Sequence, residues 1–403
     1  MNEDAINKLV QPLINIQAQQ EGIVIKAIAE RLSDMGEIIP SDVAKLEQLL
    51  RTGNDAQKIN KELSRLSGKS VQEIKSIIKE VAADSYEQAK PFYDYRHKSF
   101  IPYDKNIQLQ RTIKAIEVVS LGEYRRLSST AAFMIRSVSN PNILIPTKLS
   151  KTYNAAIDYA VQFIVNGLGN YDQMIGQTIQ MLTNSGMQTV EYAQPNGKKR
   201  YVRMDTAIRR NILDTVRHVQ QEVQNEVGKE FGADGVELSV HAFSAPDHEP
   251  FQGHQFTMEE FDKLQSGEPF KDVNGVSFAG VDRPIGMWNC RHFAWNIIIG
   301  HATPNYTPEQ LEAMKQKNAK GIKVKDKNGN LVNRSMYWCT QRQRQYEVDL
   351  RRLGEQRNAF KQAGNDEQYK NIDRKYKAKL QEYKAFSNKC GLRLKPQNFR
   401  VYN

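Results

Sequence analysis

Apolar residues recur every three or four positions over most of this chain, and that spacing places them on one face of an α-helix. From residue 2 to residue 32, for example, Ile6, Val10 and Leu13 follow one another at helical intervals. The pattern returns in four later stretches, at 107–138, 149–165, 172–183 and from Asp205 to about Phe231. Such faces are buried by packing helix against helix. We therefore expect a mainly α-helical fold.

Residues that favour helix starts punctuate this pattern. Ser70 and Glu73 have the spacing of a capping box, in which the serine begins a helix and the glutamate returns a hydrogen bond. The pair predicts a helix that begins at Ser70 and runs toward Lys90. Thr307 followed by Pro308 predicts another helix start further along the chain.

Short alternating segments predict a few strands among the helices. Residues 190–192 and 199–202 flank the turn-forming Gln194-Pro195-Asn196-Gly197 and predict a β-hairpin. Residues 236–242 alternate apolar and polar side chains, as a strand with one buried face does. Residues 324–332 surround an Asn-Gly turn and predict a second hairpin.

These segments predict three parts in the chain. We place a helical domain at 1–186, a small α+β module at 187–305, and a basic hairpin and helical tail at 306–403. From Thr340 onward, apolar residues at spacings of three and four predict two helices joined at Gly364-Asn365.

The net charge of +11 is concentrated at one end of the chain. Residues 315–403 hold 23 Lys and Arg against 8 Asp and Glu, an excess of +15, so the rest of the chain carries −4. This imbalance favours a polyanion such as double-stranded DNA, or an acidic protein surface, as a partner. A solvated helical surface would show it equally well. The nucleic-acid-binding candidates are Arg209, Arg210, Arg351, Arg352, Arg374, Lys375 and Lys377.

The remaining composition suggests a soluble protein made in a cytoplasm. Cys290, Cys339 and Cys390 are few and far apart, which makes a disulfide framework unexpected. No apolar run approaches the roughly 18 residues that span a bilayer, and the first residues do not resemble a secretory signal. We expect no membrane partner.

The chemically richest stretch runs from Val236 to His292. Five of the seven histidines lie between His241 and His301, and Cys290 lies in the same stretch. The polar residues gather in two short motifs, Pro-Asp-His-Glu-Pro-Phe-Gln-Gly and Asn-Cys-Arg-His. Their members of interest are Asp247, His248, Gln252, Gly253, Asn289, Cys290, Arg291 and His292.

Three interpretations of this stretch compete. The first is a zinc site that uses His248, His254, Cys290 and His292, with His241 or Asp247 as an optional further ligand. A lone Cys-x-His, however, lacks the paired cysteines of strong zinc motifs. The second is catalysis, either as a metal-dependent nuclease of the HNH kind or through a Cys–His pair. The third is a structural cluster whose side chains hydrogen-bond one another and the turn backbones. The residues favour the third, with no cofactor and no catalytic residue.

The order and spacing of these pieces resemble the phage minor capsid protein 2 family, which is related to the MuF-type head morphogenesis proteins. The resemblance covers the helix around Arg209-Arg210, the strand 236–242, the motif from Pro246 to Gly253, and the Asn-Cys-Arg-His motif. It implies a virion protein of tailed phages that is associated with the portal and works in head assembly beside the major capsid and scaffold proteins. The resemblance also suggests contact with the packaged DNA. A nuclease-like enzyme and a plain DNA-binding module are the alternatives.

The chain departs from the family pattern at three places. Ala245 replaces an arginine before Pro246, Phe251 replaces a tryptophan, and no cysteine lies in Pro284-Ile285-Gly286-Met287. If the missing cysteine is a metal ligand in the family, its absence weakens a metal site here. The departures therefore favour the structural cluster.

Overall fold

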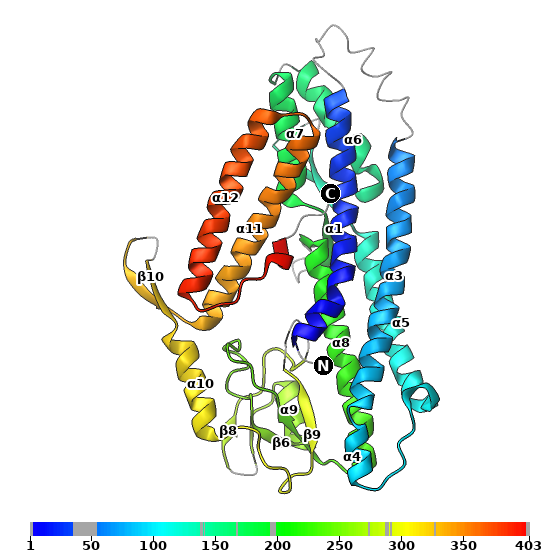
Figure 1. The fold of residues 1–403 in the computed structure, drawn as a ribbon, viewed down its shortest axis with the longest axis vertical. Coiled ribbons are helices and arrows are strands. Elements are labelled where there is room, and N and C mark those ends of the chain that lie inside the picture. Colours follow the sequence, from blue (N-terminus) through cyan, green and yellow to red (C-terminus); the bar gives the residue numbers. More distant parts are fainter. Residues whose placement is uncertain are drawn as a thin grey trace. The chain divides into compact units, whose positions relative to one another are not determined.

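The computed structural model describes residues 3–34, 55–137, 140, 142–166, 168–193, 199–272, 275–286, 290, 292–325 and 328–399. Helices dominate, with a few small sheets, as the periodicity predicts (Figure 1). The chain divides into two compact units. Unit 1 comprises Met1–Val10, Glu73–Gly122 and Arg210–Arg342. Unit 2 comprises Gln11–Gln72, Glu123–Arg209 and Gln343–Asn403. The three-part division of the chain stays a prediction.

The long helices each bury apolar side chains. They are α1 (Glu3–Asp34), α3 (Asp55–Glu87), α5 (Ile107–Ser129), α8 (Met204–Phe231), α11 (Met336–Gln362) and α12 (Asp366–Lys389). The shorter ones are α4 (Lys90–Tyr95), α6 (Leu149–Val165), α7 (Tyr171–Ser185), α9 (Met258–Ser266) and α10 (Pro308–Lys320), with 3-10 turns η2 (Tyr103–Lys105) and η3 (Pro396–Phe399). The predictions for 149–165, 172–183 and 205–231 are confirmed.

Unit 2 contains an antiparallel sheet with strand order β2-β1-β3-β4. Its strands are β1 (Ala132–Arg136), β2 (Leu144–Lys148), β3 (Gln188–Ala193) and β4 (Lys199–Arg203). Helices α6 and α7 pack against β1. The predicted hairpin is confirmed as β3 and β4, while its turn at 194–197 lies outside the described residues.

Two helix boundaries differ from the prediction. The helix expected over 107–138 ends at Ser129, and residues 132–136 instead form β1. Ser70 begins no helix, because it lies within α3. Its side chain is buried, accepts a hydrogen bond from Gln17 of α1 at 3.0 Å and donates to the Leu66 carbonyl. A buried contact with another helix therefore explains this serine better than a cap does.

The end of the chain forms the predicted helical hairpin. In Figure 1, α11 and α12 lie side by side in antiparallel directions. Gly364 turns the chain with a φ of 66°, and the Asn365 side chain caps α12 by accepting from the backbone N–H of Gln368. Leu350 and Tyr383 are buried in the seam together with Phe399.

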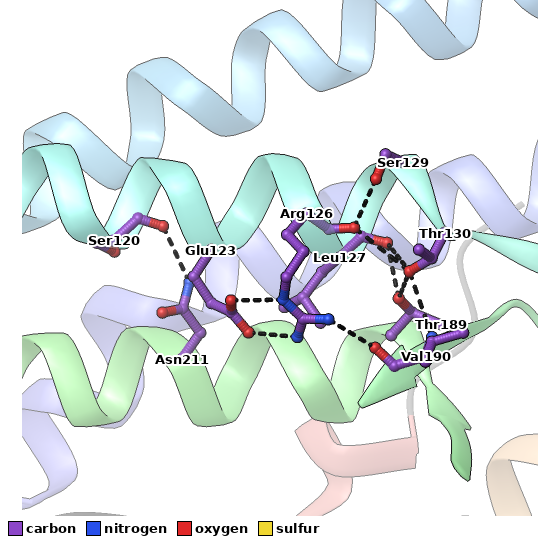
Figure 2. Close-up of polar contacts among 9 residues, drawn as sticks. All are labelled: Ser120, Glu123, Arg126, Leu127, Ser129, Thr130, Thr189, Val190 and Asn211. Atoms are coloured by element: carbon purple, nitrogen blue, oxygen red, sulfur yellow. Dashed lines mark hydrogen bonds and ion pairs between the residues drawn. The ribbon is translucent and has the colours of Figure 1, made fainter. Parts of the chain in front are cut away.

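Unit 1 holds the remaining strands. They are β5 (Gly235–Leu238), β6 (Gln255–Thr257), β7 (Phe270–Lys271), β8 (Ser277–Phe278), β9 (Ala294–Ile297), β10 (Ile322–Lys325) and β11 (Leu331–Arg334). The second predicted hairpin is confirmed as β10 and β11. The strand expected over 236–242 is confirmed as β5 but ends at Leu238. In the same unit, the Ser120 hydroxyl of α5 accepts a hydrogen bond from Thr215 of α8 at 2.9 Å. The Ser120 carbonyl accepts a hydrogen bond from the Asn211 side chain (Figure 2).

Candidate functional site

A three-stranded sheet in unit 1 supports the candidate site. Strand β5 lies between β6 and β9, and Val236 faces Phe256 on one side and Asn296 on the other. Val236 and Leu238 are buried with Phe256, Leu264 and other apolar residues in one core. Since Cys290 belongs to the same core, the sheet fixes where its thiol lies.

The chain from Ser239 to His254 forms turns that carry the first motif over this sheet. The Gln252 side chain holds them together, because its Oε1 accepts the backbone N–H of His241 at 2.9 Å. Gly253 has a φ of 75°, and a Cβ there would lie 2.6 Å from Cδ2 of Leu311. Both the backbone conformation and the close approach therefore require glycine at this position.

Three buried side chains meet at the centre of the site. The Cys290 Sγ lies 3.2 Å from Nδ1 of His248 and 3.5 Å from Nδ1 of His292. One ligand-capable atom from each residue lies within 4.8 Å of the other two. We call His248, Cys290 and His292 the His–Cys–His cluster.

The Nε2 atoms of His248 and His292 each lie within hydrogen-bonding distance of oxygen atoms. His248 Nε2 lies 2.7 Å from the carbonyl oxygen of Arg283. His292 Nε2 lies 3.3 Å from Oε1 of Gln252 and 3.4 Å from the hydroxyl of Ser244. These contacts orient both rings so that their Nδ1 atoms face the thiol.

Burial and mutual contacts shift the pKa of each member. Burial, together with the nearby His241 and His248, lowers the pKa of His292 to about 2. Burial alone would raise the pKa of the Cys290 thiol, but hydrogen bonds, first of all from His248, leave it below its usual value. Burial alone would lower the pKa of His248, but the contacts with Cys290 outweigh it and raise that pKa. His292 is therefore neutral at physiological pH.

An ion pair borders the cluster. Arg283 donates to both carboxylate oxygens of Asp247, and its NH2 lies 3.0 Å from Oδ2. Asp247 Oδ2 is 3.7 Å from Nε2 of His248. Arg283 and Ser244 were not predicted as site residues, whereas His241 was an optional further ligand of the predicted metal site. Only the positions of Arg283 and Ser244 within or beside the two motifs could have suggested them.

The structure brings together most of the residues singled out in the sequence. Gln252 and Asp247 contact the His–Cys–His cluster directly, and Gly253 forms the adjoining turn. His254 is not a member, because its ring packs on Phe256 and Phe278. Asn289 and Arg291 lie outside the described residues.

Comparison with protein families agrees with this arrangement of motifs. The family model described as phage minor capsid protein 2 matches residues 1–388. The chain belongs to this family. Membership assigns this minor capsid protein a structural role in the bacteriophage virion, implies contact with other head proteins, and implies a role other than catalysis. No curated protein and no solved structure matches the chain. Among the described residues, no helix is both long and apolar enough to cross a membrane.

The basic residues of the minor capsid protein lie in different environments. Arg351 is mostly buried, with 13% of its side chain exposed, and is paired with Asp205. Arg352 lies 3.8 Å from Asp349. Arg209 and Arg210 are half-buried. The exposed candidates are Arg374, Lys375 and Lys377, all on α12. The sequence therefore locates the exposed basic helix but cannot tell which arginines are internal.

Two further exposed lysines of α12 complete a pattern. Lys370, Arg374, Lys377 and Lys384 are all exposed and follow one another at intervals of four, three and seven residues. At 100° per residue these four positions fall within about 80° of the helix circumference. We call them the basic stripe. The opposite side of α12 carries Ile372 and Tyr383, which are buried.

Proposed function

We propose that this minor capsid protein acts inside the phage head, where it docks on the portal and contacts packaged DNA through the basic stripe. The basic stripe is the observation that carries the proposal. Four cationic side chains point into solvent along about 21 Å of helix, at a rise of about 1.5 Å per residue. DNA carries one negative charge per about 1.7 Å, so a single duplex segment can meet several of them at once.

The basic stripe is only partly neutralised within the protein. Lys377 Nζ lies 2.7 Å from Asp373, which also contacts Arg357. Both Lys377 and Lys370 remain exposed. Because exposed ion pairs contribute little free energy, a DNA phosphate can replace the Asp373 carboxylate at little cost. An acidic protein surface would meet the same charges. Binding of naked DNA to the purified protein distinguishes DNA from an acidic protein surface as the partner.

Salt-dependent DNA binding tests the DNA contact. Contacts from four cations predict that log K falls with log salt at a slope of about −3.6. This is a loss of about 150-fold in affinity between 50 and 200 mM salt. Changing the four residues of the basic stripe to Glu should abolish binding. The matched control reverses four exposed lysines of α3, Lys61, Lys69, Lys75 and Lys79, for the same change in net charge. Equal losses in both variants, or no affinity at low salt, would contradict a contact at α12.

Strand β2 supports docking on another head protein. It is an edge strand of its sheet, since it pairs only with β1 among the described residues. Ile143, Leu144 and Ile145, where this strand begins, are each about half exposed, at 51%, 51% and 47%. An exposed apolar edge can accept a strand from a partner.

Capture by the portal protein of the same phage tests the docking. Leu144→Lys places a charge on the β2 edge and should abolish capture. Leu331→Lys is the matched control, because Leu331 is 68% exposed on β11, which belongs to a different sheet. Unchanged capture of the Leu144 variant would contradict docking at β2 and leave the DNA contact untouched.

A further inference from the structure

We propose that His248, Cys290 and His292 bind a zinc ion. Zinc in proteins is held by neutral imidazole nitrogens and thiolate sulfur, and the His–Cys–His cluster offers two of the first and one of the second. All three side chains are buried, with relative exposures of 1%, 2% and 4%. This inference is independent of portal docking and of DNA contact.

The hydrogen-bonding pattern of the two imidazoles is the pattern of metal ligands. A carbonyl oxygen only accepts, so His248 Nε2 must carry a proton to bond the Arg283 carbonyl at 2.7 Å. Metal-bound histidines characteristically donate their second ring N–H in this way. The Nδ1 of His248 is then left to face Cys290.

The same reasoning shows which ring nitrogen of His292 carries the proton. The backbone N–H of His241 donates to Oε1 of Gln252, which identifies that atom as the amide oxygen. His292 Nε2 contacts this oxygen, and it also contacts the Ser244 hydroxyl. Since the hydroxyl itself donates to the Ala245 carbonyl, it too is free to accept. The proton of His292 therefore lies on Nε2 and the lone pair on Nδ1.

Without a metal, the centre of the cluster has too few protons. The backbone N–H of His292 donates to Cys290 Sγ at 3.4 Å. Apart from it, one side-chain proton, on the Cys290 Sγ or on His248 Nδ1, serves the three atoms that converge there. At least one lone pair is thus buried without a donor from within the cluster, and burying an unsatisfied polar atom costs about 1–3 kcal/mol. A cation in place of that proton would satisfy all three atoms at once.

The distances also suit zinc. Zinc–sulfur and zinc–nitrogen bonds of about 2.3 and 2.05 Å at a tetrahedral angle put sulfur and nitrogen about 3.6 Å apart. The two separations here are 3.2 and 3.5 Å. The two nitrogens lie at most 4.8 Å apart, so they would approach each other by up to about 1.4 Å. In the proposed site, these three side chains and one water molecule complete the four-coordinate zinc.

Zinc content of the purified full-length protein tests the proposal. After dialysis against zinc and removal of loose metal, we expect about one zinc per chain. Cys290→Ser and His292→Ala should lose it. His254→Ala and Cys339→Ser are the matched controls, because each removes a buried or half-buried residue of the same type outside the cluster, and both should retain the zinc.

Cobalt substitution keeps the test valid if a variant fails to fold. Co²⁺ bound to the unmodified protein should show thiolate-to-cobalt charge transfer in the near ultraviolet and the strong visible bands of a four-coordinate site. Absence of zinc from the unmodified protein, retention of zinc by a folded Cys290→Ser variant, or a cobalt spectrum without charge transfer would each overturn the proposal.

Discussion

Five charged side chains in unit 2, two of them buried and three mostly buried, show how single residues set the electrostatics of this fold. Arg203 contacts Glu21 at 2.9 Å and Glu355 at 3.1 Å, while Arg351 pairs with Asp205. Three carboxyl groups face two guanidinium groups, so full ionisation would leave one excess negative charge away from water. Burial raises the pKa of Glu21 to about 8, despite Arg203. A protonated Glu21 leaves the five residues neutral as a group.

This protonation predicts a pH-dependent stability. Between the ordinary pKa of 4.5 and the folded value of about 8, the folded protein holds a proton that the unfolded chain has released. The free energy of unfolding should therefore fall as pH rises through this range, by about 1.4 kcal/mol per pH unit near its middle. Denaturant unfolding of Glu21→Gln, which mimics the protonated form, should lack this dependence and exceed the wild type at pH 8. Parallel curves for the two proteins from pH 5 to 8 would contradict the assignment.

Gly253 gives a second prediction at the residue scale. Gly253→Ala should lower the free energy of unfolding by about 1–3 kcal/mol, because a methyl group there meets Leu311 and the backbone has a positive φ. Gly329→Ala separates the two causes, since Gly329 has a φ of 84° but nothing within 4 Å of the added Cβ. Urea unfolding should show the larger loss at Gly253. Equal losses would mean that the close approach to Leu311 is unimportant.

At the scale of elements, α5 shows where tertiary contacts override local pattern. Helical spacing continues past Ser129, yet the helix ends there. Figure 2 shows the cause: Thr130 and Thr189 place their hydroxyls 2.6 Å apart over the last turn, and Thr189 donates to the Leu127 carbonyl at 2.7 Å. Arg126 also donates to the Val190 carbonyl of β3. Carbonyls that lack helical partners are thus satisfied by the strand that follows much later in the chain.

The threonine pair can be tested as a unit. Thr130→Val and Thr189→Val should each cost about 1–2 kcal/mol, because each leaves a polar partner unsatisfied. The double variant should cost less than the sum by about 0.5–1 kcal/mol, since the two hydroxyls share one network. Chemical denaturation of the four proteins measures this coupling. Thr112→Val is the control, because its hydroxyl makes a similar bond on an exposed face of α5 and should change stability little. Strict additivity would contradict a shared network.

These elements also show what the sequence can predict. Helices α6 and α12 and the hairpin β3–β4 depend on local periodicity and turn residues, and they form where expected. Strand β1 depends on partners at 144–148 and 188, which no local window contains. In the site, motif spacing indicated His248, Cys290 and His292 as ligand types. Arg283 orients His248 through its backbone carbonyl. Because every residue has such a carbonyl, the sequence could not predict this contact.

At the scale of the whole molecule, the distribution of charge favours phosphate binding over base-specific recognition of DNA. Residues 1–314 carry a net −4, and 315–403 carry +15. Some of that excess is internal, as Arg351 shows, so net charge alone overstates the cationic surface. What remains exposed includes the basic stripe. Lysines and arginines on a helix surface reach phosphates, whereas reading a sequence needs side chains fitted to base edges in a groove.

The whole protein should therefore bind DNA without sequence preference. Phosphate contacts carry no base information, so two duplexes of equal length and unrelated sequence should bind with affinities within about threefold. Fluorescence anisotropy at low salt, with each duplex labelled in turn and the other as competitor, measures the ratio. The charge-reversed variant of the basic stripe should lose both affinities together. A preference of 100-fold or more for one duplex, equivalent to about 2.8 kcal/mol, would instead indicate base readout and a gene-regulatory module. The proposed contact with packaged DNA needs no base readout, so it predicts the first behaviour.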